Sequence, residues 1–213
     1  MDPSWQIIRS TKMTKSPATR VIKVGGSLLD LPNLATQLRD WLANQSLAHN
    51  VLVVGGGPLV EQVRRWRRRQ PPAETEMLDE VTAHWICIDL MSVTARLLHA
   101  WLPDLKFTAE MRLLKRRMQK TGETLFDPAK WLRSEEATLP GTRLPCQWEV
   151  SSDSIAARLT VVLAADELVL LKSSWPKTQS HSLTALAEEG YIDRMLPLLA
   201  PELPPLRLVN LRN

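Results

Sequence analysis

The chain has 213 residues, of which 44% are hydrophobic and 23% are charged, a composition that excludes disorder for most of the chain and allows a buried core. The formal charge is only +4, no apolar run approaches the roughly 18–20 residues of a membrane span, and the start lacks the apolar centre of a signal peptide. Two cysteines, Cys87 and Cys146, form no disulfide framework, so we expect a reduced, cytoplasmic protein with no membrane partner.

The first half of the chain alternates predicted strands with predicted helices. Residues 1–19 are polar and show no periodicity, so we expect a flexible tail, followed by a single domain over residues 20–213. Apolar runs that end in glycines predict buried strands, and apolar side chains at helical spacing predict helices. In chain order these elements are a strand at 21–24, a helix at 34–42, a strand at 51–54, a helix at 60–66 and a helix at 76–102.

The second half is less regular until about residue 148. Residues 103–147 predict only mixed short elements and turns. Beyond them the predicted elements are a helix from 152 to about 163, a strand at 167–171, helices at 183–189 and 193–199, and a strand at 206–209. Strands that are apolar throughout and alternate with helices indicate a three-layer α/β/α sandwich with a central, mainly parallel sheet.

Two glycine turns, Gly25-Gly26-Ser27 and Gly55-Gly56-Gly57, each follow a predicted strand. We expect both at the carboxyl edge of the sheet, where ligands bind in open α/β folds. Backbone N–H groups in such turns can hold a phosphate, although either turn alone is equally typical of tight packing. Neither turn matches the dinucleotide fingerprint or the Gly-Lys-Ser/Thr loop of the P-loop proteins.

Three charged residues lie next to these predicted strand ends. Lys23 stands inside an apolar strand two residues before Gly25, so we expect it to reach an anion at the sheet edge, the alternative being a lysine that extends to solvent. Lys172 repeats this pattern at the end of the strand at 167–171. Asp153 begins an alanine-rich helix and is either a plain N-cap or an acceptor that orients lysines or a metal-bound phosphate.

These motifs, in this order and spacing, resemble the amino acid kinase superfamily, which includes the uridylate, acetylglutamate and aspartate kinases. The resemblance covers residues 20–211 and is closest to a short branch that contains the methanofuran-biosynthesis kinase. It implies an ATP-dependent kinase that transfers the γ-phosphoryl group to a phosphate or carboxylate acceptor. It also implies Mg²⁺ bound with the nucleotide, and a homodimer. The segments that carry it are Gly55–Arg64, Ala83-His84-Trp85, Asp89-Leu90-Met91, 148–154, Ile192-Asp193 and Leu208-Val209-Asn210.

The resemblance implies a role for each matching residue. Lys23 would stabilise the transferring phosphoryl group, and Asp153 would orient the lysine or the metal-bound phosphate, so these two are the expected catalytic residues. Lys172 and Ser173 are expected on the nucleotide side, and no metal ligand is expected. Phosphate or substrate would bind at Gly25, Gly26, Ser27, Gly55, Gly56, Gly57, Ser152 and Ser154.

Two departures from the family pattern fall on the ATP side. The strand at 167–171 runs into Lys172-Ser173-Ser174-Trp175-Pro176, where the family usually has a Thr-Asp-x-x-Gly-type turn. Relatives also continue past the last strand with a glycine-containing loop. A second hypothesis is therefore a non-catalytic relative that keeps the anion pocket as a binding or assembly module.

The arginines at positions 64, 65, 67, 68 and 69 form a basic cluster. Such a run is most often a solvated helix end, and it could also hold a polyanion for the binding module. Nucleic-acid binding is a weaker third hypothesis, whose signature would be a steep salt dependence. His84 and Cys87 share a helix face, which is far more typical of a core than of a metal site.

Overall fold

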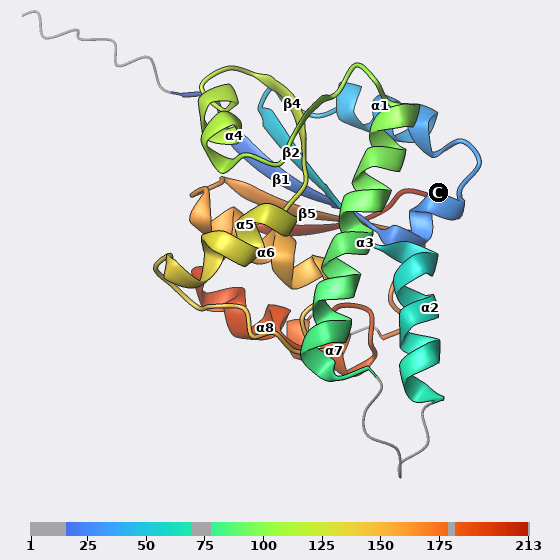
Figure 1. The fold of residues 1–213 in the computed structure, drawn as a ribbon. Coiled ribbons are helices and arrows are strands. Elements are labelled where there is room, and N and C mark those ends of the chain that lie inside the picture. Colours follow the sequence, from blue (N-terminus) through green and yellow to red (C-terminus); the bar gives the residue numbers. More distant parts are fainter. Residues whose placement is uncertain (1–15, 70–77, 179–181, 213) are drawn as a thin grey trace, which may run out of the picture.

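The computed structural model describes residues 16–69, 78–178 and 182–212, and the statements below concern these residues. Its centre is a six-stranded sheet in the order β3-β4-β2-β1-β5-β6, in which every neighbouring pair is parallel (Figure 1). The strands are β1 (Thr19–Val24), β2 (His49–Val54), β3 (Lys106–Thr108), β4 (Gly122–Phe126), β5 (Glu167–Lys172) and β6 (Leu206–Asn210).

Helices connect the strands and cover both faces of the sheet (Figure 1). The α-helices are α1 (Leu34–Ala43), α2 (Gly57–Arg68), α3 (Glu80–Trp101), α4 (Met111–Arg117), α5 (Ala129–Ser134), α6 (Ser152–Val162), α7 (Leu183–Glu188) and α8 (Leu196–Leu199). The 3-10 helices are η1 (Gly26–Asp30), η2 (Glu136–Thr138) and η3 (Ala200–Glu202). The expected three-layer α/β/α sandwich is confirmed, and the sheet is entirely parallel in the part described.

Each face of the sheet buries its own hydrophobic core because side chains alternate along a strand. In β1, Val21 joins the core beneath α6, whereas Ile22 and Val24 join the core beneath α1. Lys23 is two residues after Val21 and therefore lies on the α6 face. This register decides which helix the lysine can reach.

Helix α3 contributes to both cores. Ile88 and Met91 pack in the first core and Leu98 packs in the second. Among the described helices, α3 alone is long and apolar enough to cross a membrane by length and composition, and 44% of that stretch is buried inside the protein. The core helix of a soluble protein passes the same test, so this finding is weak evidence for a span.

The structure differs from the predicted elements mainly between residues 103 and 147. It places two strands there, β3 and β4, which the pattern does not predict. β3 has only three residues, and β4 begins with half-exposed polar residues, so neither is an apolar run. The helix predicted at 193–199 is also shorter, because α8 begins only at Leu196.

The predicted helix at 76–102 begins at Glu80 in the structure, and positions 76 and 77 lie outside the described residues. Asp79 is its N-cap, and the carboxylate accepts a hydrogen bond of 2.9 Å from the backbone N–H of Thr82. Most of the predicted tail at 1–19 also lies outside the described residues, and Thr19 already belongs to β1.

Candidate functional site

The strands β2, β1 and β5 end side by side, which brings the two glycine turns together. The register pairs Val24 with both Val54 and Leu171. Beyond these pairs, the Gly55 N–H donates to the Val24 carbonyl at 3.0 Å, and the Gly25 N–H donates to the Leu171 carbonyl at 2.9 Å. The turns are therefore extensions of the ladder and have a fixed position at the carboxyl edge of the sheet.

Gly26 and Gly57 bring the two turns into backbone contact. A Cβ atom on Gly26 would lie 2.2 Å from the Gly57 nitrogen, and one on Gly57 would lie 2.5 Å from the Gly26 oxygen. Gly57 also has a φ of +57°, which favours glycine. No other residue fits at either position, so the motif is explained by this close approach as well as by ligand binding.

The N terminus of α2 faces the space above these turns. Its N-cap is Gly56, which has no side chain to accept a hydrogen bond from the first turn. Gly56 and Gly57 both line a cleft of about 1530 Å³ at this edge of the sheet. The first N–H groups of α2 and the positive end of its dipole are thus available to an anion in the cleft.

Two lysines share one carboxylate at the floor of the cleft. Lys23 Nζ lies 2.9 Å from Oδ1 of Asp153, and Lys172 Nζ lies 2.7 Å from Oδ2. Lys172 also donates to the carbonyl of Tyr191 at 2.7 Å. Lys23 and Asp153 are only 5% and 4% exposed. Two cations against one anion leave a net positive charge, which an anionic ligand would neutralise.

Burial and charge act in opposite directions on these groups. Burial raises the pKa of Asp153, but the charges of Lys23 and Lys172 outweigh it and lower this pKa to about 2. Burial and then the charge of Lys23 lower the pKa of Lys172, and Asp153 opposes them. Asp153 is therefore ionised at neutral pH and serves as the common counter-ion of both lysines.

Ser151 is the N-cap of α6, which decides between the two predicted roles of Asp153. The Ser151 hydroxyl accepts a hydrogen bond of 3.3 Å from the Asp153 N–H. The Asp153 side chain is therefore free for the lysines. Ser152 lies against the second glycine turn, because a Cβ on Gly55 would be 2.8 Å from its hydroxyl.

The structure gathers all but one of the predicted site residues around the cleft. Ser154 is the exception: it is fully buried behind the cleft and its hydroxyl donates to Asp193. Ser173 lies at the rim, where its hydroxyl is 2.8 Å from that of Ser27. The cleft is lined by Lys23, Gly25, Gly26, Ser27, Gly55, Gly56, Gly57, Ser152, Asp153, Lys172 and Ser173.

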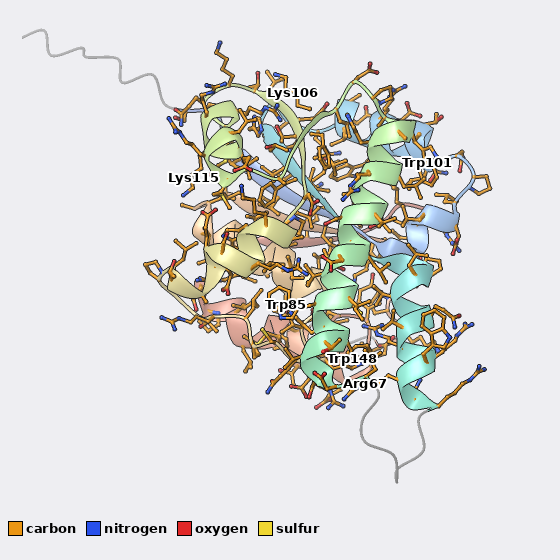
Figure 2. The ribbon with its side chains drawn as sticks, in the orientation of Figure 1. Arg67, Trp85, Trp101, Lys106, Lys115 and Trp148 are labelled. Carbon is orange, nitrogen blue, oxygen red and sulfur yellow. The ribbon has the colours of Figure 1, made fainter. Side chains whose placement is uncertain are left out.

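Part of the basic cluster also lines the cleft. Arg64, Arg65 and Arg68 of α2 line it. The guanidinium groups of Arg64 and Arg67 lie 5.5 and 5.3 Å from the ring centre of Trp148, and Figure 2 shows Arg67 beside this tryptophan. The cluster is therefore not simply a solvated helix end.

The sequence does not predict a role for Trp148, Tyr191 or Asp193. Each makes a contact with a residue distant in sequence: Trp148 contacts α2, Tyr191 contacts Lys172, and Asp193 contacts α6. Trp148 and Asp193 lie in segments that carry the family resemblance, and Asp193 is also an acidic residue just before a short helix. Local sequence patterns do not indicate such contacts, because the partners are distant in sequence.

His84 and Cys87, the two residues weighed above as a metal pair, both line the cleft. His84 Nδ1 is 3.2 Å from the Gln147 carbonyl, and burial lowers the pKa of this histidine. Burial raises the pKa of Cys87 to about 11, so its thiol is protonated at neutral pH. Across the described ranges, no group of three or more His, Cys, Asp or Glu side chains could hold a metal ion.

Comparisons with known proteins agree with this fold. The model of the "Amino acid kinase family" matches residues 18–174. UMP kinase from Ureaplasma parvum is similar in structure, with a TM-score of 0.56 and 12% identity over 92% of this chain and 91% of that one. Aspartate kinase from Synechocystis has a TM-score of 0.56 and 17% identity over 90% of this chain, but the match spans only 38% of that protein.

Carbamate kinase from Giardia lamblia bound to AMP-PNP has a TM-score of 0.51 and 11% identity, over 92% of this chain and 93% of that one. At these identities the likeness shows the fold alone. No curated protein sequence matches the chain with significance.

Proposed function

Because the chain belongs to the amino acid kinase family, we propose that it transfers the γ-phosphoryl group of ATP to a phosphate or carboxylate acceptor. The observation that carries the proposal is the pair of buried lysines on one carboxylate, beside two glycine turns that contact each other. Phosphoryl transfer depends on positioning and charge neutralisation. This arrangement supplies both.

In the proposed reaction each group at the cleft floor has one task. Lys23 neutralises charge on the transferring phosphoryl group, and the glycine N–H groups bind phosphate oxygens. Asp153 holds Lys23 and Lys172 in place. Each oxygen of Asp153 already lies within 2.9 Å of a lysine nitrogen, so Asp153 does not serve as a direct Mg²⁺ ligand. The site therefore fits Mg²⁺ that is bound through nucleotide phosphates and water.

We place the nucleotide beside the end of β5. The turn there lacks the acid and the glycine of the family pattern, yet Lys172, Ser173 and Ser174 all line the cleft. The AMP-PNP complex of the carbamate kinase supports nucleotide binding in this fold. The altered turn is the feature that would favour the non-catalytic anion-binding module instead.

The part of the cleft that α2 lines suits an anionic acceptor. Arg64, Arg65 and Arg68 line it, and the N terminus of α2 adds its positive dipole. Within this class, the resemblance to the methanofuran branch favours an aminomethyl-furanmethyl phosphate. We also propose a cytoplasmic location, which is consistent with the two unpaired cysteines, Cys87 and Cys146.

The test is ADP release by the purified protein with Mg-ATP and one acceptor at a time. We expect release that depends on an acceptor with a phosphate or carboxylate group, and the furanmethyl phosphate tests the narrower proposal. Nucleotide binding without ADP release for any acceptor in the panel would favour the non-catalytic module. No nucleotide binding at all would contradict the kinase.

The implied homodimer has support in an exposed apolar stripe on α3. Ile86, Val93, Leu97 and Trp101 recur along one face and are 37–46% exposed. Figure 2 shows Trp101 near one end of this helix. We propose that α3 packs on α3 of a second copy, because such a stripe on a helix surface is typical of an interface.

Charge favours an antiparallel arrangement of these two helices. Asp89 and Arg96 lie about one turn on either side of Val93, so a two-fold axis at Val93 would place Asp89 near Arg96 of the partner subunit. Asp89 also pairs with Arg133 of its own chain at 2.9 Å. The surface is therefore complementary to itself.

We expect the Leu97→Glu variant to be monomeric, because the substitution buries a charge in the interface. Molar mass from light scattering during size-exclusion chromatography is the measurement. Leu198→Glu is the matched control, since Leu198 is 65% exposed on α8 and lies outside the stripe. A wild-type chain that is monomeric at the highest concentration tested would contradict the dimer.

A further inference from the structure

We propose that Asp193 is a positioning residue that sets the place of both Asp153 and Lys172 in the cleft. The inference rests on the proposed function, in which these two side chains support phosphoryl transfer. It assigns Asp193 no contact with the reacting atoms. Instead, Asp193 acts through the backbone at the start of α6 and through the segment 191–193.

The Asp193 carboxylate accepts six hydrogen bonds from four residues. Oδ2 accepts from the N–H and hydroxyl of Ser151 at 2.9 and 2.6 Å, and from the Ser154 N–H at 3.0 Å. Oδ1 accepts from the Ser154 hydroxyl and from the N–H groups of Met195 and Leu196 at 3.1 and 3.0 Å. Four of the six partners are backbone N–H groups, which can only donate, and the other two are serine hydroxyls.

These bonds fix the backbone on both sides of Asp153. Ser151 is the N-cap of α6, Ser154 is in its first turn, and Asp153 lies between them. Asp193 is about 40 residues away in sequence from both serines, so it ties α6 to a distant segment. The Asp153 carboxylate is thereby held where both lysines can reach it.

The same segment also holds Lys172. The carbonyl of Tyr191, two residues before Asp193, accepts a hydrogen bond of 2.7 Å from Lys172 Nζ, and the Tyr191 ring lies 5.0 Å from that nitrogen. Asp193 thus anchors the segment 191–193 to α6, and this anchor fixes the distance between Lys172 and its carboxylate partner. One residue supports both members of the ion pair.

The Asp193→Asn variant separates this role from simple filling of space. Asparagine has nearly the same size, but its amide nitrogen is a donor and would face three donors. We expect the start of α6 to shift away from the segment 191–193, so that Lys172 loses its fixed partners. Asp79→Asn is the matched control, because the Asp79 carboxylate also accepts a backbone N–H at the start of a helix and does not line the cleft.

The first readout does not depend on activity. Chemical labelling of Lys172, measured by mass spectrometry on folded protein, should become at least several-fold faster in Asp193→Asn and stay unchanged in Asp79→Asn. An unchanged labelling rate in Asp193→Asn would overturn the inference. This readout decides the inference even if the wild-type protein releases no ADP, an outcome that would count against the proposed function alone.

The second readout is a double-mutant cycle on kcat. We expect Asp193→Asn to lower kcat at least tenfold with Asp153 and Lys172 present, and to add almost nothing in the Asp153→Asn/Lys172→Met background, because it acts through those two residues. An equal loss in both backgrounds would mean a merely structural role and would overturn the inference. Temperatures are chosen at which every variant is folded.

Discussion

Replacement of Lys23 by methionine is expected to reduce the rate of phosphoryl transfer by about 10³-fold. Lys23 is the charged residue of β1 nearest to the first glycine turn, and its ammonium nitrogen lies 2.9 Å from Asp153 at the floor of the cleft. Methionine keeps the buried aliphatic stem and removes the charge. Asp153 retains Lys172 as its counter-ion at 2.7 Å, so the fold should survive the change.

The measurement is kcat from ADP release at saturating ATP and acceptor. Lys115→Met is the matched control, since Lys115 is exposed on α4 and does not line the cleft. Figure 2 shows it far from Trp148, which does line the cleft. We expect this control to be as active as the wild type. A Lys23→Met variant within tenfold of wild-type kcat would exclude Lys23 from the chemistry.

The Asp153→Asn variant is expected to lower the free energy of unfolding by about 3–5 kcal/mol at pH 7, the usual effect of breaking a buried ion pair. The substitution leaves Lys23 and Lys172 together with no carboxylate between them. Since the buried ammonium groups are the cause, additional Lys23→Met and Lys172→Met changes should restore most of the lost stability. Urea unfolding measures all these variants.

The pH dependence of this loss has a defined sign. A buried lysine whose pKa is lowered in the folded state binds fewer protons there than in the unfolded state, so stability rises with pH. Lys172 already has a lowered pKa in the wild type. The deficit of Asp153→Asn is therefore largest near neutral pH and shrinks as the pH approaches the ordinary lysine value of about 10.4.

The wild-type carboxylate gives a dependence of the same sign, but at acid pH. The pKa of Asp153 is lowered to about 2 in the folded protein, from an ordinary value of 3.8. Its stabilising contribution is thus complete above pH 3.8 and is lost as the pH falls from there through 2. A loss below about 1 kcal/mol for Asp153→Asn at pH 7, with no change at higher pH, would contradict the buried charge cluster.

The parallel sheet could be predicted because four of its strands are apolar runs, two of them closed by glycine turns. β1 and β2 are fully buried, and each begins two residues before its predicted start. β3 and β4 could not be predicted, since they are short and carry polar, partly exposed residues. β4 pairs with β2, and β3 pairs with β4, so tertiary pairing supplies the order that the local sequence lacks.

The site could be predicted as a set of residues but not as a set of contacts. Fold topology alone brings Lys23, Asp153 and Lys172 to one sheet edge, yet nothing local indicates that one carboxylate serves both lysines. Lys172 therefore lies at the centre of the charge cluster and not simply on the nucleotide side. The Ser154 hydroxyl is bonded to Asp193, and four of the six hydrogen bonds of Asp193 join residues about 40 apart in sequence.

The most direct test of the kinase assignment is a thermal-unfolding titration with Mg²⁺ and the ATP analogue AMP-PNP, on wild type and Lys23→Met. At about 100 times the dissociation constant, a ligand of the folded state adds roughly 2.7 kcal/mol to stability. We predict this stabilisation in the wild type and a weaker one in the variant. No stabilisation of the wild type at millimolar nucleotide would contradict a nucleotide-binding cleft.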